Sequence, residues 1–395
     1  MALFHPKISL FVKGRKDVFS LLEKKISKND KIIWVHVASL GEFEQGLPVI
    51  ERIKKTYPAY KFLVTFFSPS GYEVKKNTTV ADIVTYLPID TIANTNKFMA
   101  LVHPELAIFV KYEIWPTYLR KLKEHNIPTF LISAIFNERQ GYFKWYGRLM
   151  RKALKSFSHF FVQNQESVKL LANLGFKNVT VSGDTRFDRV TEILERNNEL
   201  VFMQDFKKNQ ICIVAGSTWP EDEKILTDFI NSSDKELKYI LAPHNIKKEH
   251  IDSLKQSINK TTLLFSEINQ QDLSGIEVLI IDTIGLLTKI YSYADIGYVG
   301  GAFATGLHNT LEPAVFGIPV VIGPNYQGFI EAEELVKHGG ILTVDSEAEF
   351  SLKLNKLLED PDYLDSTGKI NSGFINENRG ASDKIMEYVS MVIAP

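Results

Sequence analysis

Short, continuous apolar segments recur along the whole chain, and longer amphipathic segments separate them. They lie at 31–37, 61–67, 82–87, 105–110, 128–133, 159–163 and 178–183, and then at 211–216, 238–243, 262–266, 277–282, 295–301 and 318–323. A strand that is apolar on both sides must be covered on both faces, which is typical of parallel sheets flanked by helices. The pattern therefore predicts an α/β protein with two doubly wound parallel sheets.

The length of the chain also indicates two domains. A single hydrophobic core stops growing at about 250–300 residues, and this chain has 395. The segment between the two sets of apolar runs is charged and contains no such run. We therefore expect a first domain at 1–190, a linker at 191–208 and a second domain at 209–375. The last segment, 376–395, has the pattern of an amphipathic helix that packs back on the first domain.

Composition excludes several classes of protein. A net charge of -1 gives no general attraction for nucleic acid, so we expect no nucleic-acid partner. The chain has one cysteine, Cys212, within an apolar run, so no disulfide framework is possible and a reducing compartment is indicated. No apolar run approaches the length of about 18 residues that a membrane-spanning helix needs, so any membrane contact is expected to be peripheral.

Two segments concentrate positive charge. Residues 1–31 carry eight Lys or Arg against three acids, a local net charge of 8 − 3 = +5. A second run, "RQGYFKWYGRLMRKALK" at 139–155, mixes cations with aromatic side chains. This mixture is typical of segments that settle on an anionic membrane surface. A solvated helix face with a few core aromatic residues explains the second run equally well.

Candidate functional residues follow the predicted strands, where ligands collect in parallel sheets. Glu42 comes after the first strand and is either a helix cap or a base that points into a cleft. Ser217 and Thr218 precede Pro220, a residue suited to the first turn of a helix, so they either bind phosphate or cap that helix.

The stretch "GGAFATGLHNTLEPAVFGIPVV" offers a second candidate site. Its glycines, Gly300, Gly301 and Gly306, let the backbone approach a ligand, and Glu312 is placed to accept both hydroxyls of a ribose. The alternative is that the glycines are turn residues and that Glu312 interacts with the helix dipole.

Six segments in this order resemble the Kdo transferases of Gram-negative bacteria. They are "WVHVASLGEFEQGLPVI", "YEIWP", "GDTRFD", "AGSTWPEDE", "DTIGLLTKIYSYADIGYVGGAF" and "HNTLEPAVFGIPVVIGP". The resemblance implies the GT-B fold, with two Rossmann-like domains facing across a cleft. It also implies transfer of 3-deoxy-D-manno-octulosonate (Kdo) from CMP-Kdo to a lipid A precursor in lipopolysaccharide biosynthesis, with inversion at the anomeric carbon.

The resemblance assigns roles on the acceptor side. It makes Glu42 the base that takes the proton of the acceptor hydroxyl. Glu113 matches the second acidic position of the family and orients the acceptor or Glu42. Gly41 would allow close approach of the acceptor, and Ser68 and Ser70 would contact it from a loop, although both serines are also suited to turn formation.

On the donor side, the resemblance places the CMP phosphate at Gly216, Ser217 and Thr218. It makes Asn309, Thr310 and Glu312 the residues that hold the phosphate, the sugar and the ribose of the donor. Gly306 belongs to the same donor site. Arg186 stands where relatives commonly have lysine, and it faces the carboxylate or phosphate of the donor or forms a structural ion pair. A single phosphate gives a divalent ion no diphosphate to bridge, so we expect neither a metal nor a cofactor.

The chain departs from the family pattern in three places. His244, Lys247 or Lys248 must replace a missing arginine, and the contact with the lipid phosphate moves to Arg139 or Lys144. Relatives usually begin with a membrane-spanning anchor, whereas this sequence opens with a basic stretch, and we expect that the anchor has been removed before "MA". The expected location is the cytoplasmic face of the Gram-negative inner membrane.

Other functions share parts of this pattern. Another GT-B glycosyltransferase or a nucleotide-sugar epimerase would have the same sheets and glycines but would use a UDP-sugar. A catalytically inactive nucleotide-sugar sensor or membrane scaffold would keep the "HNTLEP" region and would not need Glu42.

Overall fold

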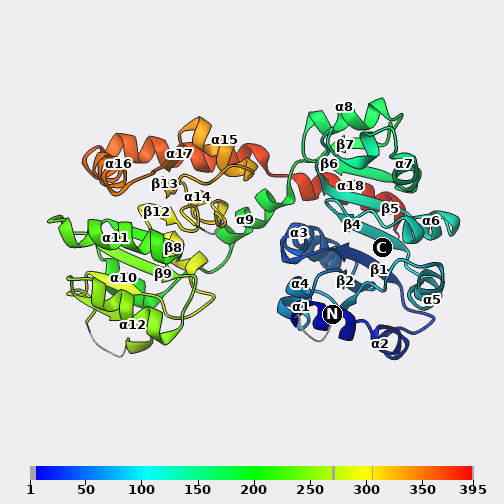
Figure 1. The fold of residues 1–395 in the computed structure, drawn as a ribbon, viewed down its shortest axis with the longest axis horizontal. Helices are drawn as coiled ribbons and strands as arrows, with labels where there is room; N and C mark the ends of the chain where they lie inside the picture. Colours follow the sequence, from blue (N-terminus) through cyan, green and yellow to red (C-terminus); the bar gives the residue numbers. More distant parts are fainter. Residues whose placement is uncertain (1–5, 269–271, 305, 394–395) are drawn as a thin grey trace. The chain divides into compact units, whose positions relative to one another are not determined.

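The chain folds into two compact units, which a computed structural model describes for residues 6–268, 272–304 and 306–393. Residues 1–5 of the predicted first domain, Thr305 of the glycine-rich stretch and the last two residues lie outside this description. One unit comprises Met1–Arg189 together with Asn378–Pro395, and the other comprises Val190–Glu377 (Figure 1).

A parallel sheet of seven strands forms the centre of the first unit. Its strands are β1 (Ile32–Val37), β2 (Lys61–Phe66), β3 (Ile83–Tyr86), β4 (Leu106–Val110), β5 (Thr129–Ala134), β6 (His159–Val162) and β7 (Val179–Val181). Their order is β3-β2-β1-β4-β5-β6-β7, so the direction of winding reverses between β1 and β4. In sheets of this kind the crevice for a ligand opens at that reversal, outside the carboxyl ends of the strands.

Helices cover both faces of the first sheet (Figure 1). They are α1 (Pro6–Lys13), α2 (Val18–Lys25), α3 (Leu40–Thr56), α4 (Pro69–Lys75), α5 (Ile92–Val102), α6 (Pro116–Glu124), the 3-10 turn η1 (Gly141–Phe143), α7 (Arg148–Leu154), α8 (Gln165–Asn173) and α18 (Ala381–Val392). The boundary between the two units falls within α9 (Thr185–Glu195). Alternate residues of β1 enter two separate cores: Trp34 packs with α5 and α6, and Val35 with α3 and α18. This accounts for the unbroken apolar runs.

The C-terminal helix α18 belongs to the first unit, and a buried aspartate secures its return. Asp188, 4% exposed, accepts hydrogen bonds from the backbone N–H of Gly380 at 2.5 Å and of Ser382 at 2.6 Å. The apolar side of α18 then packs on α3 through Ile385 and Val389. Asp188 is the last residue of the "GDTRFD" segment, so part of that segment has a structural role.

The second unit repeats the architecture with another parallel sheet of seven strands. Its strands are β8 (Cys212–Thr218), β9 (Lys238–Pro243), β10 (Thr262–Leu264), β11 (Val278–Ile280), β12 (Ile296–Val299), β13 (Val320–Ile322) and β14 (Ile341–Thr343). The order is β10-β11-β9-β8-β12-β13-β14, which places the reversal of winding between β8 and β12.

The second sheet also lies between two layers of helices and turns. They are α10 (Val201–Lys207), α11 (Pro220–Ser232), α12 (Lys248–Ser257), η2 (Phe265–Glu267), α13 (Leu287–Ile290), η3 (Tyr291–Tyr293), α14 (Leu311–Ala314), α15 (Ile330–His338), α16 (Glu347–Glu359) and α17 (Pro361–Asn378). The residues predicted to form a linker, 191–208, hold the end of α9 and the whole of α10. No helix of the described residues is long and apolar enough to cross a membrane.

The predicted α/β class with two parallel sheets is confirmed, and each predicted apolar run overlaps a strand. One strand was missed, the edge strand β14 at Ile341–Thr343. It has three residues and only its first is buried, so its sequence lacks the continuous apolar run that marks the other strands. Its pairing with β13 supplies the backbone hydrogen bonds that make it a strand.

Candidate functional site

The two candidate acids of the first unit come from the two strands that flank the reversal of winding. Glu42 lies in the first turn of α3, directly after β1, and Glu113 lies in the loop that follows β4. β1 and β4 are hydrogen-bonded neighbours, so their carboxyl ends meet at one edge of the sheet. The sheet therefore brings two carboxylates that are far apart in the sequence to the same edge.

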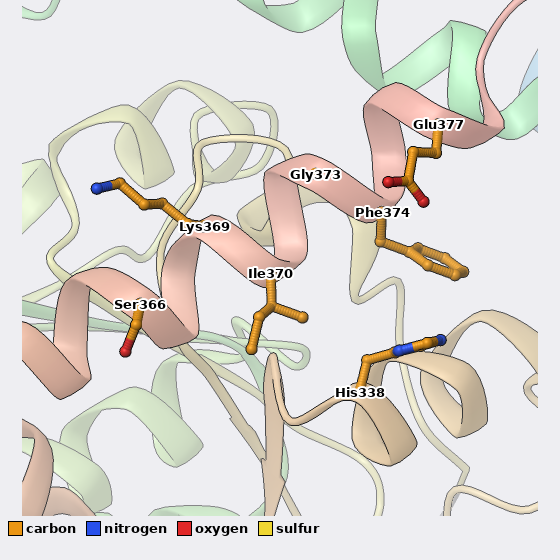
Figure 2. Close-up of a pocket in the computed structure, with 7 residues that line it drawn as sticks. All are labelled: His338, Ser366, Lys369, Ile370, Gly373, Phe374 and Glu377. Atoms are coloured by element: carbon orange, nitrogen blue, oxygen red, sulfur yellow. The ribbon is translucent and has the colours of Figure 1, made fainter.

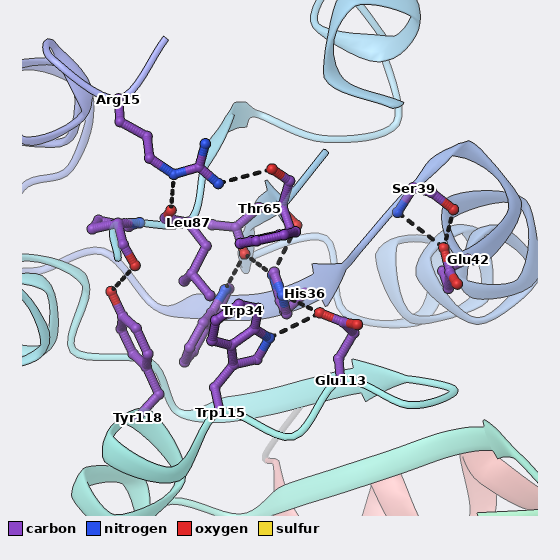
Figure 3. Close-up of polar contacts among 12 residues, drawn as sticks. Arg15, Trp34, His36, Ser39, Glu42, Thr65, Leu87, Glu113, Trp115 and Tyr118 are labelled. Carbon is purple, nitrogen blue, oxygen red and sulfur yellow. Dashed lines mark hydrogen bonds and ion pairs between the residues drawn. The ribbon is translucent and has the colours of Figure 1, made fainter. Parts of the chain in front are cut away.

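The Glu42 carboxylate closes the start of helix α3. Its Oε2 accepts the backbone N–H of Ser39 at 2.9 Å and also the Ser39 hydroxyl, so the two residues form a capping box (Figure 3). Both bonds meet one oxygen, which leaves Oε1 to contact a ligand. The two interpretations of Glu42, cap and base, are thus compatible in one geometry.

The Glu113 carboxylate is held by two donors at a single oxygen. Its Oε2 accepts the indole N–H of Trp115 at 2.8 Å and lies 2.9 Å from Nε2 of His36, while the side chain keeps 14% of its surface exposed (Figure 3). Burial by itself raises the pKa of Glu113, but the hydrogen bond and charge of His36 and the bond from Trp115 outweigh it and lower the pKa. Glu113 is therefore ionised at neutral pH.

The predicted acceptor-loop serines cap the next helix. Ser68 accepts the backbone N–H of Ser70 at the start of α4, and their hydroxyls lie 2.8 Å apart. Gly71, in the first turn, packs against the start of α3, since a Cβ there would lie 2.8 Å from the backbone N of Leu40. Gly41 meets no such obstacle, because its added Cβ would only touch the Ser39 hydroxyl at 3.9 Å.

In the second unit, the end of β8 supplies the predicted phosphate loop. Ser217 has a positive φ of 55°, a conformation that turns the chain sharply before α11. Thr218 is only 1% exposed and its hydroxyl donates to Glu223 at 3.0 Å, so it must leave Glu223 before it can donate to a phosphate. Gly216 has no room for a side chain, because a Cβ would lie 2.1 Å from the Tyr291 hydroxyl.

A buried carboxylate ties the end of β8 to the end of β12. Asp222 accepts the backbone N–H groups of Trp219 and Gly301, each at 2.9 Å, and the Tyr298 hydroxyl at 2.6 Å. The three donors lie at the two strand ends that flank the reversal in the second sheet. Burial raises the pKa of Asp222, although these three hydrogen bonds work in the opposite direction.

Three aromatic rings stack over this edge of the second sheet. His244 lies between Trp219 and His308, with ring centroids 4.7 and 4.8 Å apart. The Trp219 indole N–H donates to Nε2 of His308 at 3.1 Å, so this nitrogen carries no proton and His308 is neutral. Burial and the neighbouring His244 both lower the pKa of His308, in agreement with that state.

The predicted ribose-binding residues stand at the start of the short helix α14. Glu312 accepts the Asn309 amide at 3.0 Å through one carboxylate oxygen and the Thr288 hydroxyl at 3.1 Å through the other. Thr310 is only 1% exposed. Gly306 has a φ of 114° and no heavy atom within 4 Å of an added Cβ, so the space beside it is open.

The predicted cations lie in different surroundings. Arg186 forms an ion pair with the buried Asp184 at 2.8 Å. Arg139 is exposed, Lys144 is partly buried in the loop after η1, and Lys247 and Lys248 are exposed at the start of α12. Of the residues proposed to replace the missing arginine, His244 is the one in the aromatic stack.

Sequence reasoning missed the side chains that organise these strand ends. They are His36, Trp115, Trp219 and Asp222. All four lie inside the motifs that carry the resemblance. The type of residue could have indicated two of them, because His36 is a histidine inside an apolar strand and Asp222 is an acid in the first helical turn after a proline.

A separate pocket of about 450 Å³ lies between α15 and α17. Figure 2 shows its lining residues: His338, Ser366, Lys369, Ile370, Gly373, Phe374 and Glu377. His338 precedes β14, so the pocket lies at the amino end of that strand, opposite to the edge that carries the candidate donor residues. Within the described part of the chain, no group of His, Cys, Asp and Glu could hold a metal ion.

Comparisons with known proteins agree with the motifs. The family model of 3-deoxy-D-manno-octulosonic-acid transferase (kdotransferase) matches residues 14–189. A 3-deoxy-D-manno-octulosonic acid transferase of Aquifex aeolicus is 33% identical over 85% of this chain and 88% of its own length. The transferase of that name from Rickettsia bellii is 28% identical over 95% of this chain and 93% of its own.

Solved structures confirm the expected GT-B type of fold. The UDP-GlcNAc 2-epimerase of Neisseria meningitidis aligns with a TM-score of 0.63 at 15% identity, covering 91% of this chain and 99% of that one. At this identity the likeness extends to the fold alone.

Proposed function

The chain belongs to the 3-deoxy-D-manno-octulosonic-acid transferase family, and on this premise we propose that it transfers Kdo from CMP-Kdo to a lipid A precursor. Transfer of 3-deoxy-D-manno-octulosonic acid is the activity for which these relatives are named. The observation that carries the proposal is the chemistry at the two reversals of winding. One presents two carboxylates, and the other presents a tight turn after β8 beside the Asn309–Glu312 pair.

Glu42 acts as the general base. Its free oxygen takes the proton of the acceptor hydroxyl while the hydroxyl oxygen forms a bond to the anomeric carbon of Kdo. The bond between that carbon and the phosphate oxygen breaks at the same time, and CMP leaves with the bonding electrons. One displacement of this kind inverts the anomeric configuration, and because the leaving group is a phosphate, no acid is required to protonate it.

The donor is held at the edge of the second sheet. We assign the phosphate to the turn at Gly216 and Ser217, where Ser217 is partly exposed before α11 and the side chain of Thr218 supports the turn through Glu223. Glu312 accepts the ribose hydroxyls, which take the places of its Asn309 and Thr288 partners. Arg186 keeps its ion pair with Asp184, the structural role that was the alternative to donor binding.

The acceptor is a glycolipid, which requires contact with a membrane. Trp145, Tyr146 and Leu149 are 90%, 63% and 69% exposed, and exposed Arg139 and Arg148 lie nearby in the sequence. We call Trp145, Tyr146 and Leu149 the aromatic patch. Two of the predicted surface cations have structural roles instead: Arg151 donates to the carbonyls of Tyr142 and Lys144, and Arg15 donates to the carbonyls of Phe11, Phe67 and Leu87.

The activity is tested with CMP-Kdo and a tetraacylated lipid A precursor. We expect CMP release that depends on the acceptor, together with a lipid product that is heavier by one or more Kdo residues on mass spectrometry. Added CMP should inhibit competitively with CMP-Kdo, and UDP at the same concentration should not. Turnover of a UDP-sugar, or protection by UDP, would contradict the proposed donor and favour another GT-B enzyme.

The aromatic patch is tested with vesicles. Replacing both Trp145 and Leu149 with alanine should weaken binding to vesicles that contain anionic lipid by about tenfold or more, because the apolar area that enters the membrane is lost. Sedimentation with vesicles at two salt concentrations measures the effect and its electrostatic part. Leu352, 70% exposed in the second unit, provides the matched control through Leu352→Ala. Equal binding of all variants would exclude the patch as the membrane contact.

A further inference from the structure

A fully buried histidine lies behind Glu113. His36 is on β1, where its register partner on β2 is Thr65 and its partner on β4 is Phe109. Its side chain is 0% exposed. The rings of Phe109 and Trp115 each lie 5.7 Å from the imidazole centroid, so two sides of His36 are apolar. A polar ring in such a place needs partners at both nitrogens.

Both ring nitrogens have partners. Nδ1 lies 2.8 Å from the Thr65 hydroxyl and 3.0 Å from the Thr65 carbonyl, and Nε2 lies 2.9 Å from Oε2 of Glu113 (Figure 3). The Thr65 hydroxyl also accepts the indole N–H of Trp34 at 2.8 Å. Since an indole N–H only donates, the hydroxyl proton is free to go to Nδ1. In that neutral form, as in the doubly protonated form, Nε2 donates to Glu113.

The same oxygen of Glu113 receives the second donor, the indole of Trp115. Two N–H groups that converge on one oxygen from β1 and from the loop after β4 fix the position and the plane of the carboxylate. Oε1 receives neither bond and belongs to a side chain that is still 14% exposed. The lowered pKa of Glu113 agrees with an anion that accepts both bonds.

We propose that His36 is a positioning residue of the transferase: with Trp115 it fixes one oxygen of Glu113, so that the other accepts a hydrogen bond from a hydroxyl of the acceptor sugar. This rests on the proposed function, because it needs Glu113 to contact the acceptor. His36 itself touches no substrate. Its contribution is preorganisation, since a displacement of about 1 Å in such a group can reduce a rate by about 100-fold.

The test compares His36→Leu, which removes both ring nitrogens, with His36→Gln, whose side-chain amide keeps a donor near the place of Nε2. We expect His36→Leu to lower kcat/KM for the lipid acceptor by about 10- to 100-fold with KM for CMP-Kdo unchanged. His36→Gln should recover most of that loss. His103, whose ring nitrogens contact only backbone carbonyls, supplies the control His103→Gln.

A double-mutant cycle separates positioning from a general loss of structure. In a Glu113→Gln background, His36→Leu should cause no further loss, because its target carboxylate is already gone. A loss of the same size in both backgrounds would overturn the proposal. If His36→Leu does not fold, Trp115→Phe removes the other donor and should lower the same kinetic parameter, and unchanged kinetics in that variant would also overturn it.

The failure of the proposed function looks different. In that case the unmodified protein would transfer no Kdo to the lipid acceptor. If only the inference about His36 fails, the unmodified protein transfers Kdo, Glu113→Gln impairs the transfer, and folded His36→Leu works as well as the unmodified protein.

Discussion

Replacing Glu42 with glutamine is expected to lower kcat for Kdo transfer by about 10²- to 10⁴-fold, the usual contribution of a general base. Glutamine has the same shape, and its carbonyl oxygen still accepts the backbone N–H of Ser39, so the start of α3 stays capped. Only the ability to take a proton is lost. The measurement is acceptor-dependent CMP release, with the thermal midpoint and CMP binding recorded on the same preparation.

Two further variants separate the base from the cap. Glu44→Gln is the matched control, because Glu44 lies in the same turn of α3 and pairs with Lys75 at 2.7 Å. It should remain active. Ser39→Ala keeps the base but removes one of the two donors that hold it, so a partial loss of kcat is expected. Normal turnover by Glu42→Gln would remove Glu42 from the chemistry and leave it a helix cap.

Replacing Asp222 with alanine should destabilise the second unit by about 3 kcal/mol or more, since each buried donor left without a partner costs about 1–3 kcal/mol. Three donors lose their acceptor: the backbone N–H groups of Trp219 and Gly301 and the Tyr298 hydroxyl. The strand ends that hold the donor would also lose their connection. We therefore expect CMP affinity to fall by at least about tenfold, as measured by calorimetry on the folded fraction.

Asp222→Asn is the variant to compare with Asp222→Ala. It keeps an acceptor for the two backbone N–H groups, so it should be much more stable than Asp222→Ala, and Glu221→Ala, which alters an exposed neighbour, should change little. Equal stability of Asp222→Ala and the unmodified protein would contradict the proposed connection between β8 and β12.

The raised pKa of Asp222 also predicts a pH dependence. The folded protein holds this proton to a higher pH than the unfolded chain does. The stabilising contribution is therefore complete below the ordinary pKa of an aspartate and is lost as the pH rises through the raised folded value. Asp222→Asn should abolish this part of the pH dependence of unfolding.

The strands of both sheets were predictable because a strand that is buried on both faces is apolar at nearly every position of its sequence. Runs such as Ile32–Val37 are apolar at every position but one, and helices separate them. The edge strand β14 lacks such an apolar run, and it is a strand because its backbone pairs with β13. The capping box of Glu42 was also readable as one of two alternatives, because a cap depends on residues only three positions apart.

Glu113 and Asp222 each also have a partner from a distant strand or strand end, and these long-range partners were not predictable. His36 and Glu113 are 77 residues apart, and Asp222 and Gly301 are 79 apart. Hydrogen bonds over such separations depend on the order of strands in the sheet, which local patterns do not specify. Thr218 is a local case, because its hydroxyl donates to Glu223 in the first turn of the next helix rather than being available for phosphate.

By itself, the sequence determined the α/β class, the positions of nearly all strands and the family, since these depend on local apolar patterns and on the order of motifs. Only the tertiary structure decided which strands became neighbours, and hence which side chains meet at the two reversals of winding. The physical reason is that a buried polar group must find its partner in space. That requirement set the contacts of His36, Glu113 and Asp222.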